Sequence, residues 1–463
     1  MLNLPTTFCQ KYRDLLGEGQ AEELFAAMAD APQKAYRINQ LKSFQQVSYS
    51  QARPVPGISN AWYGQVGGRD PEWVSGTVYS QEPAAMFPAY SAAVQPGDRV
   101  LDLCAAPGGK STAIGEALRG QGLLVANEIS ASRAQILREN IERWGIANAL
   151  VTSAAPASLA AQFPQFFDKI LVDAPCSGEG MFRKNPAAAQ YWSQDYVLTC
   201  QRRQQEILLA AVKMLKPGGE LIYSTCTFAP EENEQIVSWL VEQFDFQVQP
   251  LALRGVKVAS GRPEWAQGET CLSQTIRFWP FDGLGEGQFV AKLRLPGQET
   301  QPCPSPKKKL AKPKIPQGGL TRSEQELVAT VLDYFTLPTC LAEWANRSRV
   351  SHGHVFIPVL PPANLHVKVV NNGSELGLLK KNRFEPGHQL AMLLGQVKQE
   401  RVIDLSAAAY LSYLHGETLP VKTALRGFVL VSYHNFIFSF GKVAGNGILK
   451  NFYPKGLRIL KKD

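Results

Sequence analysis

Two cysteines stand directly after predicted strands, in segments rich in small and polar residues. Cys176 lies in DAPCSGEG (173–180), which opens with Asp173, and Cys226 lies in YSTCT (223–227). Carboxyl ends of parallel strands meet at one edge of a sheet, so we expect these three side chains to lie together. A thiolate is a strong nucleophile, whereas most cysteines are simply buried and inert. Two cysteines beside an aspartate favour covalent catalysis over structural packing.

The positions of the histidines limit what these thiols can do. All six histidines lie beyond residue 351. Neither a histidine-assisted thiol nor a Ser-His-Asp triad is therefore expected in the half that holds the cysteines, which disfavours a protease or esterase. Thiolate activation would fall to nearby cations, for which Lys110, Arg183 and Lys184 are the candidates.

A loop of small residues follows the first predicted strand in VLDLCAAPGGKS (100–111). Ala105, Ala106, Gly108 and Gly109 allow a ligand to approach the backbone at the start of a helix. The spacing matches neither GxGxxG nor GxxxxGK[ST], so a pyrophosphate site is disfavoured. A tight turn with no ligand is the plain alternative.

An acidic residue, Glu128, ends the next predicted strand. A carboxylate in this position can accept hydrogen bonds from the two hydroxyls of a ribose. Together, the loop and Glu128 predict an adenosine cofactor without phosphates, and S-adenosylmethionine is the candidate. Taken alone, Glu128 would be interpreted as a helix-capping or surface carboxylate.

The thiols and this cofactor fit one reaction. Cytosine C5 is a poor nucleophile, but a thiolate that adds to C6 turns the ring into an enamine that can attack a sulfonium methyl group. Asp173 can favour the charge that develops at N3 or O2, and a base must later remove the C5 proton. Methylation of cytosine at C5 would therefore give both thiols and the aspartate a role.

Short apolar runs alternate with helical segments through the first 295 residues. This alternation predicts an α/β fold, a Rossmann-like doubly wound sheet closed by an antiparallel hairpin over 272–295. The strands are expected at 100–104, 123–127, 149–153, 169–173 and 220–224, with helices at 132–144 and 195–215, the second ended by KPGG.

Composition divides the chain into five parts. We predict a small N-terminal α+β lobe (1–75), the Rossmann-like domain (76–295), an extended linker (296–319), an intermediate α/β domain (320–395) and a β-rich, basic and aromatic module (396–463).

The C-terminal third of the chain differs in net charge from the rest. Residues 301–463 hold 22 Lys and Arg against 10 Asp and Glu, a net +12, whereas residues 1–300 hold 26 against 30, or −4. This asymmetry favours a polyanionic partner for the C-terminal third, against the alternative of a basic surface kept for solubility. Residues 1–300 are expected to keep the cofactor site as one folded unit without that third.

Composition also limits the setting. Eight cysteines without any CxxC pair predict neither a zinc site nor a disulfide framework, and no metal is expected. No apolar run approaches the length of a membrane span, and the first residues lack the pattern of a signal peptide. A cytoplasmic monomer is predicted.

The motifs, in this order and spacing, resemble the NOL1/NOP2/Sun RNA cytosine-5 methyltransferases. The matching segments are CAAPGGK (104–110), NEISASR (127–133), DAPCSGEG (173–180) and YSTCT (223–227), flanked by RINQLK (37–42) and YSQEP (79–83). The tail KNFYPKGLRI (450–459) is similar to the PUA-type RNA-binding end of the bacterial RsmF-like branch, whose members modify the decoding region of small-subunit rRNA.

The resemblance implies roles for particular residues. Cys226 would be the nucleophile and Cys176 would assist product release, with 16S rRNA, naked or in the assembled small subunit, as substrate and RNA binding at both ends of the chain. Cofactor contacts would fall on Glu128, Arg133, Asp173 and the loop residues Cys104, Ala105, Ala106, Pro107, Gly108, Gly109 and Lys110.

The chain departs from its relatives at three positions. Ala155 stands where relatives often have an aspartate near the adenine, and Phe281 and Gln288 replace histidines. The adenine contact is therefore left open.

Two other classes remain as alternatives: a methyltransferase acting on tRNA, other RNA, DNA or protein, and a non-enzymatic ribosome assembly factor on the same scaffold. DNA enzymes of this chemistry use the cysteine after proline as nucleophile, so Cys226 favours an RNA enzyme. Retention of both cysteines and the whole loop argues against an inactive scaffold.

Overall fold

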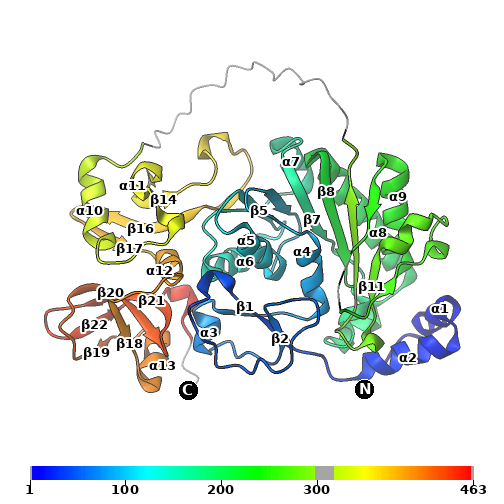
Figure 1. Cartoon of the computed structure of the whole chain (residues 1–463), viewed down its shortest axis with the longest axis horizontal. Helices are drawn as coiled ribbons and strands as arrows, with labels where there is room; N and C mark the ends of the chain where they lie inside the picture. The colour runs from blue at the N-terminus through cyan, green and yellow to red at the C-terminus, as the bar shows by residue number, and fades with distance from the viewer. Residues whose placement is uncertain (1–2, 252, 254, 298–317, 460–463) are drawn as a thin grey trace, which may run out of the picture.

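A computed structural model describes residues 3–251, 253, 255–297 and 318–459, and places one large mixed sheet at its centre (Figure 1). The strand order is β10-β11-β12-β8-β7-β4-β5-β6-β15, with β9 also on β12. The five predicted parallel strands are confirmed as β4 (Arg99–Asp102), β5 (Leu123–Asn127), β6 (Ala149–Thr152), β7 (Phe167–Asp173) and β8 (Leu215–Thr225). The antiparallel strands are β9 (Gln247–Gln249), β10 (Ala259–Ser260), β11 (Ile276–Phe278) and β12 (Gln288–Arg294), so the closing hairpin is also confirmed.

Helices cover both faces of this sheet, because successive strand residues point to opposite sides. Val100 packs in one core and Leu101 in the other. The helices are α4 (Phe87–Ser91), α5 (Gly109–Leu118) and α6 (Ala131–Trp144) on the first face, and α7 (Pro156–Gln162), α8 (Gln194–Met214) and α9 (Glu234–Phe244) on the second.

The predicted helix 195–215 is confirmed as α8, which stops at Met214, just before KPGG (216–219). The following strand differs from the prediction, because β8 begins at Leu215 and not at Glu220, so KPGG lies within it. Leu215 is buried and already extended, so the strand continues the helix without a loop.

The N-terminal part is a helix pair and a three-stranded antiparallel sheet. Its elements are α1 (Thr6–Leu16), α2 (Glu18–Ala29), β1 (Ala35–Ile38), β2 (Ala61–Tyr63), α3 (Pro71–Val74) and β3 (Val78–Ser80), in strand order β2-β1-β3. Fully buried Arg37 ties this sheet to the start of α5, since its Nη2 donates to the Gly109 carbonyl at 2.7 Å and to Thr112 Oγ1 at 2.6 Å.

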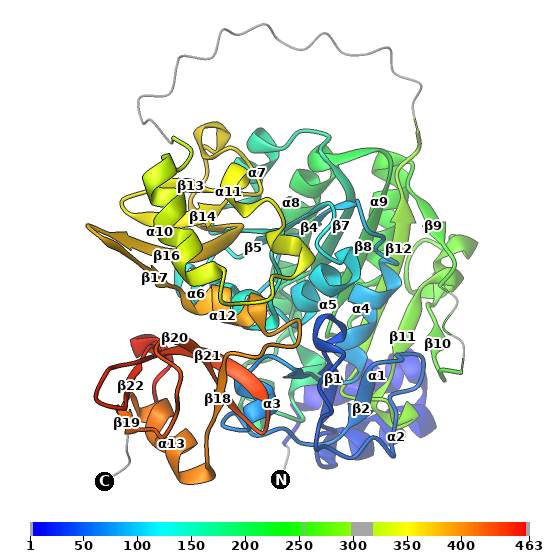
Figure 2. The ribbon, with the colours of Figure 1, turned by 60° about the vertical axis from the view of Figure 1, so that its left-hand side comes forward.

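The C-terminal part forms two sheets around one continuous hydrophobic core, with α12 between them (Figure 2). The first group holds α10 (Arg322–Leu332), α11 (Trp344–Arg347), β13 (Arg349–Ser351), β14 (His354–Ile357), β16 (Ser374–Lys380), β17 (Arg383–Pro386) and α12 (His388–Leu394). The second holds β18 (Val402–Asp404), α13 (Ala407–His415), β19 (Leu419–Pro420), β20 (Gly427–Tyr433), β21 (Phe436–Val443) and β22 (Ile448–Asn451). The boundaries between the five predicted parts stay predictions.

A strand from the C-terminal part extends the central sheet. β15 (Val369–Asn372) pairs antiparallel with β6, and Leu365 and Val367 just before it pack on the core beneath. This pairing corrects the expectation that residues 1–300 form a self-sufficient unit, because deleting the C-terminal third would leave the edge of β6 open and uncover apolar surface.

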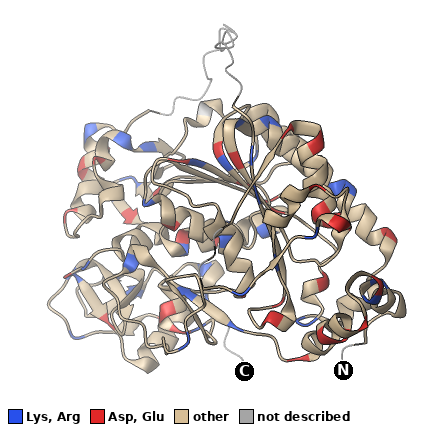
Figure 3. Ribbon diagram, turned by 45° about the vertical axis from the view of Figure 1, so that its right-hand side comes forward, with Lys and Arg blue, Asp and Glu red and all other residues tan. Residues whose placement is uncertain are grey.

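Much of the basic charge of the C-terminal third lies outside the described residues, as does most of the predicted linker. Seven of its 22 Lys and Arg fall in 307–314 and 461–462. In the described part, basic and acidic residues are interspersed (Figure 3). No helix of the described chain is long and apolar enough to cross a membrane.

Candidate active site

The two motif cysteines meet at the carboxyl ends of neighbouring strands. Cys176 follows β7 and Cys226 follows β8, and their sulfur atoms are 3.5 Å apart. A hydrogen bond to Cys226, together with burial, raises the pKa of the Cys176 thiol well above its ordinary value. Cys176 is therefore held as a neutral thiol, and at this distance either sulfur can donate a hydrogen bond to the other.

Asp173, at the end of β7, is held by three donors. Lys110 Nζ lies 2.6 Å from Oδ2, and Ser224 Oγ and Gln288 Nε2 donate to Oδ1 at 2.7 and 3.2 Å. Burial acts to lower the pKa of Lys110, but the charge and hydrogen bond of Asp173 outweigh it and raise that pKa. Lys110 is therefore a fixed ammonium group beside the cysteines.

The other two predicted cations lie elsewhere. Arg183 pairs with Glu286 at 3.5 Å and donates to the backbone carbonyls of Asp30 and Ala31, and Lys184 is exposed on the surface. Neither residue lines the cavity that contains Cys176 and Cys226, so the prediction that they activate a thiol is wrong.

A buried carboxylate, Glu179, joins the two cysteine loops to the N-terminal helix. It accepts hydrogen bonds from Tyr12 of α1 at 2.5 Å, from Trp192 Nε1 at 2.8 Å, and from Thr227 Oγ1 and Phe228 N at 2.8 and 2.9 Å. A charge without solvent contact is tolerated only when it is fully hydrogen-bonded, as here. Glu179 therefore fixes the segment after Cys226 against the one after Cys176.

A second buried carboxylate, Glu232, makes the same kind of bridge. Its Oε2 accepts from Ser177 N at 3.0 Å and from Gln204 Nε2 at 2.7 Å, and burial raises its pKa to about 7. We assigned neither Glu179 nor Glu232 a role from sequence. Glu179 lies inside DAPCSGEG, and Glu232 lies a few residues after YSTCT. An acidic residue near each cysteine with no assigned role was the signal that could have identified them.

One cavity of about 710 Å³ takes in the cysteines and the cofactor loop. This volume lies in the range of small-molecule sites, roughly 300–1,000 Å³. The predicted residues on its wall are Cys104, Ala106, Glu128, Arg133, Asp173, Cys176 and Cys226. The other predicted residues, Ala105, Pro107, Gly108, Gly109 and Lys110, are outside its lining and shape the turn behind it or, for Lys110, reach Asp173. Lining residues that sequence reasoning missed include Ile129, Pro156, Met181, Arg203 and Ile207.

The loop and Glu128 are locked together by one arginine. Arg133 donates from Nη2 to the Ala106 carbonyl at 2.8 Å, and its Nη1 lies 3.3 Å from Glu128 Oε2. Glu128 is only 4% exposed, and its Oε1 accepts from Ser130 N at 2.9 Å. Gly108 has φ +117°, which only glycine adopts without strain, so the turn into α5 depends on it.

The residues of this cavity fit an adenosine cofactor. Glu128 offers carboxylate oxygens at one wall, and Ile129, Pro156 and Ile207 offer apolar surface for a purine ring. Ala155 is also on the wall, so any adenine contact there is apolar or through backbone. Burial raises the pKa of the Cys104 thiol, which keeps that side chain neutral.

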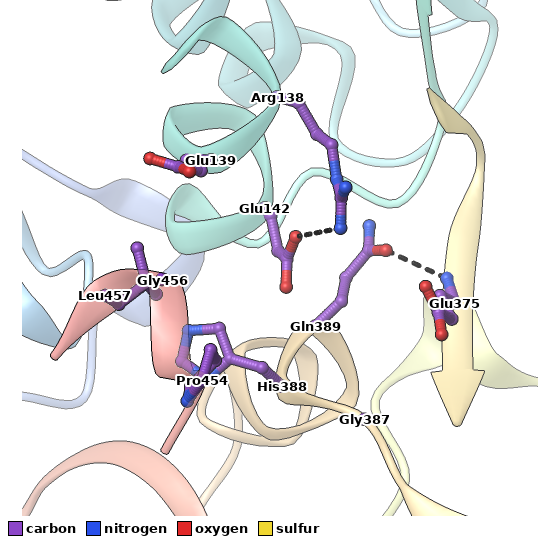
Figure 4. Close-up of a pocket in the computed structure, with 10 residues that line it drawn as sticks. All are labelled: Arg138, Glu139, Glu142, Glu375, Gly387, His388, Gln389, Pro454, Gly456 and Leu457. Atoms are coloured by element: carbon purple, nitrogen blue, oxygen red, sulfur yellow. Dashed lines mark hydrogen bonds and ion pairs between the residues drawn. The ribbon is translucent and has the colours of Figure 1, made fainter. Parts of the chain in front are cut away.

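A smaller hollow of about 240 Å³ lies where three parts of the chain meet (Figure 4). His388 and Gln389 of α12 face α6, which contributes Arg138, Glu139 and Glu142. None of its lining residues comes from the cysteine loops, so it belongs to the packing of the C-terminal part on the catalytic domain.

A Rossmann-like sheet with an adenosine-type cavity and paired thiols at its strand ends defines a methyltransferase. Four family models match: "16S rRNA methyltransferase RsmB/F" over 89–294, and RsmF-specific models for an N-terminal domain (4–83), a first C-terminal domain (335–394) and a PUA domain (400–459). The chain belongs to the RsmB/F family of 16S rRNA methyltransferases, in its RsmF branch, which confirms the resemblance carried by the motifs.

Named relatives match this chain over two thirds of its length or more. The "Ribosomal RNA small subunit methyltransferase F" of Vibrio vulnificus is 30% identical over 98% of this chain and 97% of its own. The protein of the same name from Pectobacterium atrosepticum is 36% identical over 67% of this chain and 66% of its own.

Solved structures match about two thirds of the chain. A methyltransferase homologue from Pyrococcus horikoshii has a TM-score of 0.55 and 28% identity, covering 64% of this chain and 96% of that one. NSun6 of the same organism, solved with SFG, has a TM-score of 0.53 and 20% identity over 64% and 99%, and shows the shared fold.

Proposed function

We propose that this enzyme transfers a methyl group from S-adenosylmethionine to C5 of a cytidine in 16S rRNA, by covalent addition of Cys226 to C6. The observation that carries the proposal is the pair of cysteine sulfurs 3.5 Å apart, in the same cavity as Glu128 and the 104–110 loop. A methyl donor and a nucleophile can meet there.

Cys226 begins the reaction. Its thiolate forms a bond to C6, and the ring electrons move toward N3 and O2, so that C5 becomes nucleophilic. S-adenosylmethionine supplies the electrophilic methyl group that C5 takes up. The hydrogen bond from Cys176 stabilises the Cys226 thiolate before the addition.

Asp173 and Lys110 stabilise the negative charge that develops on the cytosine ring. The ammonium group of Lys110 is bonded to Asp173 at 2.6 Å, and both are fixed by strands and α5 before any substrate arrives. A preorganised donor of this kind stabilises the charge at N3 or O2 more in the transition state than in the bound substrate.

Cys176 acts at the end of the reaction. After the C5 proton is removed, the bond between Cys226 and C6 breaks, and the electron pair returns to the Cys226 sulfur. The Cys176 thiol, kept protonated by its environment, donates a hydrogen bond to that departing sulfur. This role needs the short sulfur–sulfur distance that the loops maintain.

The flanking parts of the chain are assigned to RNA capture. The PUA domain match (400–459) and the RsmF N-terminal match (4–83) support RNA contacts on both sides of the cavity. The names of the relatives support small-subunit rRNA as the substrate. We further propose a monomer that acts in the cytoplasm. Transfer RNA is the alternative substrate.

The test is product analysis. The full-length enzyme would be incubated with labelled S-adenosylmethionine and with 16S rRNA, small subunits or tRNA, each from cells lacking this enzyme. We expect 5-methylcytidine after nuclease digestion, mapped to the decoding region of 16S rRNA or of the subunit. Label in another nucleoside would overturn the chemistry, and label only in tRNA would overturn the substrate.

A further inference from the structure

One face of α8 leads from the cavity to the surface. Tyr196, Cys200, Arg203 and Ile207 are spaced by four, three and four residues, so they form one stripe along the helix. Ile207 and Arg203 line the cavity beside Cys176, and Cys200 is fully buried. The stripe therefore begins inside the cavity and ends in solvent.

Arg203 is a charged side chain at the outer wall of the cavity. It is exposed and lines the cavity, and within the described part of the chain it makes no hydrogen bond or ion pair. Its neighbour Arg202 is also exposed, but points to another face of α8 and donates to the Leu198 carbonyl of its own helix at 3.3 Å. Of these two arginines, Arg203 is the one that lines the cavity and can reach a ligand there.

Tyr196 is a large aromatic side chain at the outer end of the stripe. It is 42% exposed, although it stands next to buried Cys200 on the helix. The nearby Cys200 thiol, together with partial burial, raises the pKa of Tyr196. The ring is thus neutral, close to the cysteine loops and open to solvent.

We infer that this stripe binds the single-stranded nucleotides next to the target cytidine, with Arg203 on a phosphate and Tyr196 stacked on a base. The inference rests on the proposed function. A flipped cytosine that reaches Cys226 draws its neighbours past the cavity rim, and α8 forms that rim. Seven residues of helix separate Arg203 from Tyr196, about 10 Å, so a phosphate and a neighbouring base can be held together.

The phosphate contact of Arg203 is tested by comparing it with the neighbouring Arg202. Full-length wild type, Arg203→Gln and Arg202→Gln would bind a fluorescein-labelled RNA fragment of the 16S decoding region at several salt concentrations. We expect Arg203→Gln to weaken binding at least fivefold and to reduce the log–log salt slope by about 0.7, the value for one single-strand phosphate contact. Arg202→Gln should change the affinity less than twofold.

Binding of S-adenosylmethionine, measured by calorimetry, should be equal in all three proteins. A loss of cofactor affinity in Arg203→Gln with unchanged RNA affinity would assign Arg203 to the cofactor and overturn the inference.

The stacking contact is tested on the same helix. Tyr196→Ala should raise the KM for the RNA fragment at least fivefold and leave kcat within twofold, whereas Tyr196→Phe should behave as wild type. Leu198→Ala, an exposed residue on the opposite face of α8, is the control. Equal KM values for Tyr196→Ala and Leu198→Ala would overturn the assignment of stacking.

The proposed function and the role of α8 can be tested separately. If the wild type forms no 5-methylcytidine, the proposed function fails whatever these variants do. If the wild type forms it and the Arg203 and Tyr196 variants bind RNA as tightly as wild type, only the role of α8 fails.

Discussion

The cavity around Cys226 and the hollow around His388 both enclose ionisable side chains, but they are assembled in different ways. Cavity residues come mainly from the strand ends of one sheet, and Asp173 and Glu128 there are each held by more than one donor. The hollow is built where α6, α12 and the chain after β22 meet. Within the described residues, the buried Nδ1 of His388 has no hydrogen-bond partner.

The cavity therefore serves the reaction, whereas the hollow serves the packing of the C-terminal part on the central sheet. A site at strand ends is rigid because the sheet fixes it, whereas a junction between parts of the chain depends on packing alone. Changes in the cavity should therefore affect turnover with little effect on stability. Changes at the junction should affect stability with little effect on chemistry.

The largest effect is expected for Cys226→Ala. Without the thiolate no covalent addition takes place, so turnover should fall below about a hundredth of wild type, while S-adenosylmethionine binding is retained because the thiol faces the base. Single-turnover methylation of rRNA measures this. Cys271→Ala, a partly exposed cysteine outside the cavity, is the control, and residual turnover above that level would contradict the assignment.

Asp173→Asn should come next, with kcat lowered about 100-fold or more, because Lys110 loses its ionic partner and the group facing the ring is no longer preorganised. A matched ion pair lies at the other end of β7, where Asp168 pairs with Lys216. Asp168→Asn should leave kcat within twofold. Similar losses in both variants would show that β7 merely tolerates no change of charge.

Gly373→Ala tests the junction. Gly373 follows β15 with φ +78°, and a Cβ there would lie 2.0 Å from the Ile357 carbonyl oxygen, so the strand must shift. We expect a loss of at least about 1–2 kcal/mol in the free energy of unfolding, and unchanged kcat at low temperature. Denaturant unfolding measures the loss.

Gly268 has φ +88° with no atom near its Cβ position, so Gly268→Ala isolates the backbone cost. If the two alanine variants lose the same stability, the close approach of Gly373 to Ile357 does not contribute to the fold.

The smallest effect concerns pH. Burial, with the nearby charges of Lys42, Arg143 and Arg138, lowers the pKa of His388 to about 3. In the unfolded chain His388 takes up a proton near pH 6.5, whereas in the folded chain it stays neutral to about pH 3. The free energy of unfolding therefore falls as the pH drops below 6.5. At pH 5 the loss should be on the order of 1–2 kcal/mol, and His388→Gln should remove it.

The neighbouring Glu142 acts in the opposite sense. Burial raises its pKa to about 7, so its contribution is present at low pH and is lost as the pH rises toward 7. The difference in unfolding free energy between wild type and His388→Gln, measured from pH 7 to pH 5, isolates the histidine. A difference that does not change with pH would contradict the assignment.

The sequence predicted the cavity well because each of its parts lies in one short segment. The strands, the loop before α5 and the acid at the end of β5 were all visible as local patterns, and the edge rule brought Cys176 and Cys226 together. Arg183 was misplaced because position along the chain says nothing about which way a side chain turns.

The junction could not be predicted in the same way. The pairing of β15 with β6 joins residues more than 200 positions apart, and its sequence, VVNN, has no alternation that distinguishes an added edge strand from a loop. The roles of Glu179 and Glu232 were missed for a similar reason, since their partners on α1 and α8 come from distant segments.

Trapping of a protein–RNA adduct tests the central claim most directly. In Cys176→Ala, addition to C6 and methyl transfer proceed but release stalls, so a covalent complex between the full-length protein and 16S rRNA should survive denaturing electrophoresis. It should disappear in the Cys176→Ala, Cys226→Ala double variant. An adduct trapped by Cys226→Ala instead would exchange the roles of the two cysteines, and its absence from every variant would contradict covalent catalysis.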